Sequence, residues 1–144
     1  MEPATIGRVT TEALIENVFD LWNVSQGSLP PDQVRRVTVS DALVDTGSFY
    51  LCLPGHLVRQ LGLMKQGSRH VTTTLGEGKA DIYGTVRLTI MGRDCAMDVM
   101  ELPDKLPVLI GQLPLEALDF VVDPKGQKLV GNPAHGGEFI IEMY

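Results

Sequence analysis

A single carboxylate, Asp45, stands between two apolar stretches and constrains the fold most. The run Ala42-Leu43-Val44 precedes it, a Thr-Gly-Ser turn at 46–48 follows it, and apolar residues resume at Phe49. Burying a carboxylate between such flanks is unfavourable unless hydrogen bonds, a partner or a catalytic use compensates it. The two hydroxyls of the turn can bond the carboxylate, and the bare backbone of its glycine permits close approach. An ordinary turn uses the same residues, so the surrounding sequence has to decide.

Composition predicts a mostly β protein with an aliphatic core. The 144 residues suit one domain over 1–144, with 44% hydrophobic residues to form a core and only 6% aromatic ones. Glycine, with 15 residues, and proline, with 9, favour short strands and turns over long helices.

Charge and cysteine usage exclude several classes of partner. The net charge is −6, and Lys and Arg are scattered apart from the pair Arg35-Arg36, so we expect no nucleic acid partner. No apolar run approaches the ~20 residues that cross a bilayer, and no signal peptide is visible. We therefore expect a soluble, cytoplasmic protein without a membrane partner. Cys52 and Cys95 lack metal-ligand spacing and are expected to be buried, reduced thiols.

Hydrophobic patterning predicts the elements in chain order. The first segment favours strands over 6–16 and 18–25, with a helix over 11–22 as the alternative. After a loop at 25–32, further strands are expected over 34–39, through the apolar run before Asp45, and over 69–75, 80–91, 95–102 and 108–111. Short helices are expected over 53–62 and 113–120, then a hairpin over 121–130 and a last strand over 139–144. His56 opens the first of these helices and is expected to have a surface or capping role.

The tip between the strands at 69–75 and 80–91 is rich in glycine. Its sequence Gly76-Glu77-Gly78-Lys79 lacks the spacing of a phosphate-binding loop and leads into a strand rather than a helix. The segment therefore predicts a hairpin with a glycine-rich tip.

Three features in this order resemble the retropepsin-like aspartic proteases, in a bacterial-type form. They are the strand into the Asp-Thr-Gly-Ser turn at 45–48, the glycine-tipped hairpin, and Leu109-Ile110-Gly111 before a short helix. The resemblance runs from about Arg36 to Val130 and implies an all-β acid-protease barrel with one or two short helices and half an active site per chain. Residues about 1–33 would form an N-terminal extension, and about 119–144 a C-terminal hairpin and tail.

Peptide hydrolysis by water needs a base for the water proton and an acid for the amide nitrogen, and two carboxylates that share a proton supply both. The chain holds one suitable motif. Neither Asp41 nor Asp94 precedes Thr-Gly or Ser-Gly, and Asp123 is followed by proline where the turn needs an N–H. A two-fold homodimer that pairs Asp45 of both chains is the economical solution, and retropepsins are similar in being homodimers of that kind. The sequence thus predicts an aspartic endopeptidase that acts on peptides or proteins without a metal or other cofactor.

The resemblance also assigns roles around the catalytic Asp45. Thr46 would bond across the dimer axis, Gly47 would bring its N–H to the carboxylates, and Ser48 would donate to the outer oxygen of Asp45. Many viral relatives carry Arg after the Ile-Gly pair, where this chain has Gln112.

The glycine-tipped hairpin would form a flap over an extended substrate. The flap residues are expected to be Thr74, Leu75, Gly76, Glu77 and Gly78. The pocket is expected to be lined by Leu109, Ile110 and Gly111, although core residues would show the same pattern. The alternatives are a weak or inactive peptide-binding or dimerisation module on the same fold, and a purely structural dimer.

Overall fold

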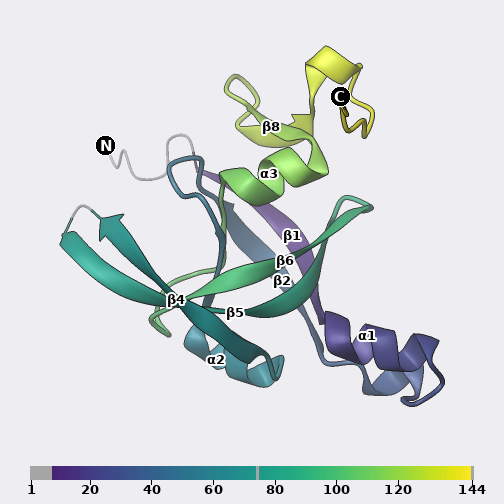
Figure 1. The fold of residues 1–144 in the computed structure, drawn as a ribbon. Helices are drawn as coiled ribbons and strands as arrows, with labels where there is room; N and C mark the ends of the chain where they lie inside the picture. The colour runs from purple at the N-terminus through teal and green to yellow at the C-terminus, as the bar shows by residue number, and fades with distance from the viewer. Residues whose placement is uncertain (1–7, 74, 144) are drawn as a thin grey trace.

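Six strands close into a barrel in the computed structural model, which describes residues 8–73 and 75–143 (Figure 1). The order around the ring is β1-β2-β7-β3-β6-β5, and a further pairing of β1 with β5 closes it. The ring strands are β1 (Val9–Asn17), β2 (Arg36–Val44), β3 (Leu51–Pro54), β5 (Gly76–Ile90), β6 (Arg93–Leu102) and β7 (Leu109–Ile110). The predicted mostly β architecture is confirmed. Strand β1 closes the barrel although it falls in the range expected to be an N-terminal extension.

The core of the barrel is aliphatic, as its composition indicated. Along β5 the buried residues Ile82, Val86, Leu88 and Ile90 are separated by half-buried ones, which is the period-2 pattern of a strand with one face on the core. Side chains from every part of the ring meet this face with no exposed surface, among them Ala13, Ile15, Leu51, Leu53, Val99 and Ile110.

Strand β4 (Met64–Thr73) ends the seven-stranded sheet and pairs with β5. The two strands form a long hairpin, paired from Met64 opposite Gly84 to Thr73 opposite Gly76, which projects from the barrel (Figure 1). The hairpin predicted in this region is therefore present.

The described part of the chain forms three α-helices beside the barrel: α1 (Val18–Ser25), α2 (Gly55–Gln60) and α3 (Gln112–Leu118). The strand predicted over 18–25 is wrong, because α1 occupies this segment. The side chain of Asn17 accepts the N–H of Asp20 at 3.1 Å and so caps the helix. The buried Asp20 carboxylate in turn binds the Arg35 guanidinium through two bonds, at 2.8 and 2.9 Å. These polar contacts outweigh the local preference of the β-branched residues for a strand.

The chain after α3 forms the hairpin β8 (Phe120–Asp123) and β9 (Lys128–Gly131), and short 3-10 turns lie at η2 (Pro31–Gln33) and η3 (Pro133–His135). The last strand predicted over 139–144 is wrong for the described residues 139–143, which are not in a strand. The Ile140 N–H instead donates to the Asp119 side chain at 3.2 Å, which removes it from any strand ladder.

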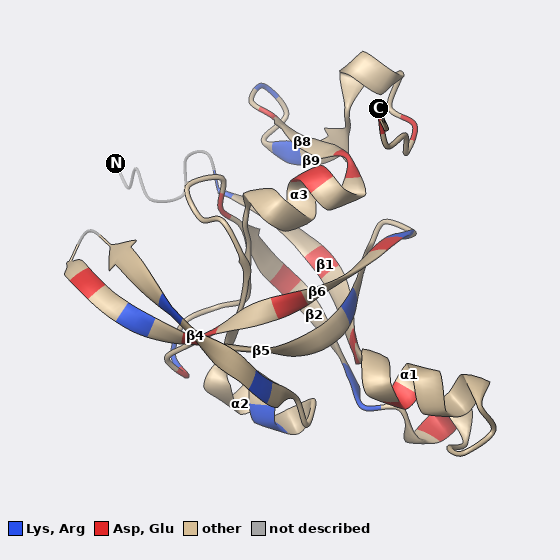
Figure 2. Ribbon diagram, in the orientation of Figure 1, with Lys and Arg blue, Asp and Glu red and all other residues tan. Residues whose placement is uncertain are grey.

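Charges of both signs are spread over the elements, and acidic and basic residues lie close together along β5 (Figure 2). Among the helices of residues 8–73 and 75–143, none has the length and apolarity needed to cross a membrane.

Candidate active site

Asp45 directly follows β2, in a loop of residues 45–50 that we call the Asp45 loop. β2 runs parallel to β7, and the Asp45 N–H donates to the Ile110 carbonyl at 2.9 Å. The half-buried carboxylate of Asp45 accepts the Gly47 N–H at 3.0 Å, and the Ser48 N–H donates to the Asp45 carbonyl at 3.1 Å. The backbone of the loop therefore fixes the position of this carboxylate.

Backbone hydrogen bonds from the start of α3 also hold the Asp45 loop. The N–H groups of Gly111, Gln112 and Leu113 donate to the carbonyls of Tyr50, Ser48 and Phe49 at 3.1, 2.8 and 2.8 Å. Amides at a helix start lack hydrogen-bond partners within the helix. These bonds therefore give partners both to the N–H groups at the start of α3 and to the carbonyls of the Asp45 loop. Gln112, which stands where many viral relatives carry Arg, acts here through its backbone.

Gly111 is required by the close approach of the two segments. An ideal Cβ on this residue would lie 2.5 Å from the Tyr50 carbonyl oxygen and 2.7 Å from the Ser48 carbonyl oxygen. Both obstacles are backbone atoms that cannot rotate away. The glycine of the Leu-Ile-Gly motif therefore allows α3 to contact the Asp45 loop.

A cleft of about 1010 Å³ opens between the Asp45 loop and the β4–β5 hairpin. Its first wall comprises Asp45, Gly47, Ser48, Phe49, Tyr50, Cys52 and Leu109. The hairpin contributes Arg69, His70, Val71, Thr72, Thr73, Lys79 and Ala80, and the end of β6 contributes Met100, Glu101, Leu102 and Pro103. The volume suits a ligand as large as a peptide segment.

The residues predicted around Asp45 and at the Leu-Ile-Gly motif divide into two groups. Asp45, Gly47, Ser48 and Leu109 line the cleft, and Thr46 is exposed beside it. Ile110 and Gly111, which were predicted to line the pocket, are not among the residues that line this cleft. Ile110 has no exposed surface in the barrel core, and Gly111 is buried beneath the Asp45 loop.

The predicted flap residues lie at the tip of the β4–β5 hairpin. Leu75, which is 98% exposed, and the exposed residues Gly76, Glu77 and Gly78 are not among the residues that line the cleft. Thr74 lies outside the described residues. The cleft is instead lined by the flanks of the hairpin, among them Thr72, Thr73 and Lys79.

The Ser48 hydroxyl differs from its predicted role as a donor to Asp45. Its oxygen lies 3.8 Å from the sulfur of Cys52, a buried residue on the cleft wall. Burial raises the pKa of the Cys52 thiol, and the nearby Asp45 charge acts in the same direction, against the lowering effect of the Ser48 bond. Cys52 is therefore a protonated thiol rather than a thiolate nucleophile.

Cys95 is also a free cysteine but is half-buried rather than buried as predicted. Burial and the charge of Asp94 raise the pKa of its thiol to about 11. His56 is exposed at the start of α2, where its backbone N–H donates to the Asp104 carboxylate at 2.7 Å, which fits the predicted surface role. Across residues 8–73 and 75–143, no three His, Cys, Asp or Glu side chains gather in a way that could hold a metal ion.

Two walls of the cleft were not predicted from the sequence. The hairpin flank could have been found from strand register, since His70 pairs with Lys79 and Arg69 with Ala80. The end of β6 carries no local signal. It reaches the cleft because β6 pairs in parallel with β3, which sets Leu53 opposite Glu101.

Comparison with known proteins supplies fold-level neighbours. No family model matches this sequence, and no curated protein matches it. Among solved structures, EIAV protease complexed with the inhibitor HBY-793 is similar with a TM-score of 0.51 and 18% identity, over 76% of this chain and 86% of that chain. The solution structure of simian foamy virus (mac) protease gives a TM-score of 0.45 and 18% identity, over 74% of this chain and 90% of that one. The closed barrel, the Asp45 loop and the likeness to EIAV protease together show that the chain has the retropepsin-like aspartic protease fold.

Proposed function

We propose that the protein is an aspartic endopeptidase whose active site pairs Asp45 from two copies of the chain. The observation that carries the proposal is the half-buried Asp45 carboxylate, fixed by the Gly47 N–H in a cleft of about 1010 Å³. A rigidly held carboxylate in a cleft of this size is what peptide hydrolysis requires.

The proposed reaction needs both carboxylates. The ionised carboxylate takes a proton from water, and the resulting hydroxide attacks the carbonyl carbon of the peptide. The protonated carboxyl of the partner chain then delivers its proton to the amide nitrogen, the C–N bond breaks, and the dyad is left with one proton to share. Two close carboxylates hold different protonation states because they cannot both ionise easily. One chain supplies one carboxylate of this kind, so the homodimer is part of the proposal.

Other parts of the site support substrate binding. The β4–β5 hairpin lies across the cleft from Asp45, so an extended peptide between them would bond to strand backbone and be shielded from water. Exposed Thr46 is available for a bond across the dimer axis. Free Cys52 and Cys95 suit a reducing compartment, and a cytoplasmic location belongs to the proposal.

The decisive experiment compares Asp45→Asn with Asp41→Asn, which removes an exposed carboxylate of β2 from the same segment. Cleavage of quenched fluorescent peptides is measured between pH 4 and pH 8, with circular dichroism as the check on folding. Asp45→Asn should lower kcat/KM by about 10³-fold or more, and Asp41→Asn should leave it within about twofold.

An active wild type whose Asp45→Asn variant cleaves equally well would disprove the Asp45 mechanism. A folded dimer that binds peptides without cleaving them would favour the peptide-binding module instead.

A further inference from the structure

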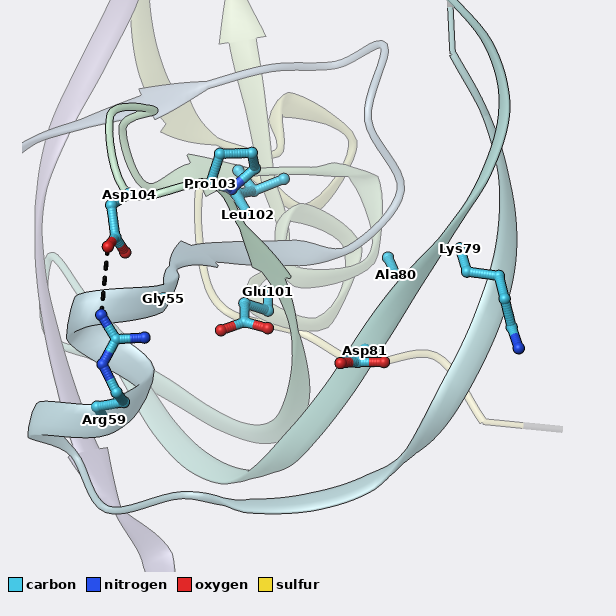
Figure 3. A pocket seen from close by; sticks show the side chains of 9 residues that line it. All are labelled: Gly55, Arg59, Lys79, Ala80, Asp81, Glu101, Leu102, Pro103 and Asp104. Atoms are coloured by element: carbon cyan, nitrogen blue, oxygen red, sulfur yellow. Dashed lines mark hydrogen bonds and ion pairs between the residues drawn. The ribbon is translucent and has the colours of Figure 1, made fainter.

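A smaller pocket of about 370 Å³ (Figure 3) shares part of its lining with the cleft. The residues that line both are Lys79, Ala80, Glu101, Leu102 and Pro103. Gly55 and Arg59 of α2, Asp81 of β5 and Asp104 complete the smaller pocket, and no part of the Asp45 loop lines it. The two pockets adjoin along this shared wall, and we call them together the groove.

Most charges on the walls of the smaller pocket already have partners. The Arg59 guanidinium binds the Asp104 carboxylate at 3.2 Å. Asp81 accepts the Ser68 hydroxyl at 2.8 Å and pairs with Lys65 at 3.3 Å, and these two contacts hold the pKa of Asp81 below its ordinary value. These pairs are satisfied without a ligand.

Glu101 differs from these neighbours. Its half-buried side chain projects from the end of β6 into the space between Arg59 and Asp81 (Figure 3), and it has no hydrogen bond or ion pair with the described residues. Lys79, the other charge on the shared wall, points away from the pocket (Figure 3). The unpaired charge that faces the groove is therefore negative.

The position of the Glu101 carboxylate is set by its surroundings. An ideal Cβ on Gly55 would lie 2.8 Å from Glu101 Oε2, 3.0 Å from Asp104 Oδ1 and 3.1 Å from Arg59 Nη1, so the Glu101 carboxylate, Asp104 and Arg59 all surround Gly55 at the start of α2. Beside it, Ala80, Leu102 and Pro103 provide an apolar wall. A site with an apolar wall that ends at a carboxylate fits a long side chain with an aliphatic stem and a cationic end.

We propose that Glu101 makes this pocket a subsite for a lysine or arginine side chain of the peptide substrate. The inference rests on the proposed peptidase function and adds a substrate class to it. The basic residue would flank the cleaved bond rather than form it, since no part of the Asp45 loop lines this pocket. An acidic side chain would be repelled at this position by Glu101 and by the paired carboxylates Asp81 and Asp104.

The test profiles cleavage of a complex peptide library that retains internal Lys and Arg, followed by kcat/KM on matched peptides in which Lys is replaced by norleucine. The variants are Glu101→Gln, Glu101→Lys and, as a control, Asp32→Asn at the exposed turn η2. The wild type and the control should prefer the lysine peptide by roughly 10-fold, the effect of one charge-assisted contact. Glu101→Gln should abolish the preference, and Glu101→Lys should reverse it toward acidic residues.

An Asp45-dependent peptidase without this preference, or one whose preference survives Glu101→Gln, would overturn the inference and leave the proposed function intact.

A second experiment separates binding from catalysis. Peptides are selected from the same library on immobilised Asp45→Asn protein and on the Asp45→Asn, Glu101→Gln double variant. Lys and Arg enrichment on the first protein alone supports the subsite, even if cleavage is never found. Equal enrichment on both overturns it.

Discussion

At the residue scale, Gly111 is the position with the least tolerance. We predict that Gly111→Ala lowers the free energy of unfolding by about 1–3 kcal/mol, because the new methyl group would lie 2.5 Å from the Tyr50 carbonyl oxygen and must push the Asp45 loop aside. Urea unfolding measures the loss of stability. The variant should also lose cleavage activity under conditions in which it is still folded, because the displaced loop carries Asp45.

Gly67→Ala is the matched control for this change. A Cβ on Gly67 meets its nearest neighbour, the end of the Arg69 side chain, at 3.8 Å, which is ordinary contact. Its unfolding free energy should stay within about 0.5 kcal/mol of the wild type. Equal losses for the two alanine variants would contradict the backbone-clash explanation.

Glu16 is the most deeply buried carboxylate in an ion-pair network, with 3% of its side chain exposed. Its two oxygens accept bonds from Arg36 at 3.1 Å and from Arg87 at 2.8 Å, which ties β1 to both of its neighbours in the barrel. We predict that Glu16→Gln lowers the free energy of unfolding by about 1–3 kcal/mol, because charge-assisted bonds to a buried acceptor are weakened.

Asp104→Asn provides the comparison for Glu16. Asp104 pairs with Arg59, but its side chain is 59% exposed, so solvent screens the attraction. The same urea titration should show a clearly smaller loss of stability for Asp104→Asn than for Glu16→Gln. If the two substitutions destabilise the protein equally, burial is not what gives the Glu16 network its strength.

Residue-level prediction from sequence succeeded where chemistry and local backbone coincide. Asp45 could be singled out because a carboxylate amid apolar neighbours requires an explanation. Leu109 and Ile110 could not be distinguished, because two adjacent apolar residues in a short strand look alike until pairing with β2 and β3 sets their faces. Glu101 carries no local signal at all, since the role proposed for it depends on Arg59 and Asp81 already having partners.

At the scale of elements, the C-terminal tail after β9 is held by side chains rather than by strand pairing. His135 bridges Asp119 at 2.6 Å and Glu142 at 2.8 Å, and Arg93 donates to the Gly137 carbonyl at 2.5 Å. The Arg93 guanidinium also lies between the rings of Phe120 and Phe139, at 4.5 and 5.3 Å from their centroids. The tail therefore depends on ionised groups.

This attachment predicts a pH window for the tail. The bond to Asp119, and after it the bond to Glu142, raises the pKa of His135 above its ordinary 6.5, while the bond to His135 lowers the pKa of Asp119 below its ordinary 3.8. The His135 contribution is fully present below pH 6.5 and is lost as pH rises through the raised value. The Asp119 contribution is present above pH 3.8 and is lost as pH falls through the lowered value.

Hydrogen exchange of residues 132–143 measures the effect directly. Protection, corrected for intrinsic exchange rates, should be greatest between pH 4 and pH 6 and should decline toward pH 9. His135→Gln cannot carry the charge, so its protection should be lower at pH 6 and should not decline in the same way at high pH. A wild-type tail equally protected at pH 6 and pH 9 would show that the His135 charge does not hold it.

The element predictions failed where a side chain competes with the backbone pattern. The strand expected over 18–25 is α1 because Asn17 caps a helix and Asp20 binds Arg35. The sequence does contain a hint of this, since Asn17 and Asp20 are three residues apart, as in a helix-capping pair. The helix α2 was predicted well, because glycine is a typical residue after the end of a helix. Gly62 follows α2 and has φ of 64°, a conformation that favours glycine.

At the scale of the whole molecule, the proposed dimer predicts a dominant effect of inactive chains. Mixing wild type with an equal amount of Asp45→Asn protein, after exchange of subunits, places half of the wild-type chains in mixed dimers. Activity should then fall to about half of that of the wild type alone.

The control adds an equal amount of Asp41→Asn protein, which should raise activity to about twice that of the wild type alone, because its mixed dimers keep both Asp45 carboxylates. Full activity with Asp45→Asn, after joint unfolding and refolding, would contradict a shared active site.

The barrel as a whole could be predicted from order and resemblance, but not from any local pattern. Its closure depends on β1 meeting β5 and on β7 entering between β2 and β3. Such pairings between distant segments leave no periodic trace in the sequence. The barrel was predicted from the resemblance to a family, because local strand propensity alone does not specify these pairings.

The late position of β7 in the chain has a consequence for biosynthesis. A nascent chain that has not yet reached Leu109 contains the whole Asp-Thr-Gly-Ser sequence, yet β2 and β3 then have no strand between them. The Asp45 loop also lacks the Ile110 carbonyl and the N–H groups of Gly111, Gln112 and Leu113. The ribosome must therefore release almost the complete barrel before these contacts can form, so the growing chain lacks the finished site on which the proposed activity depends.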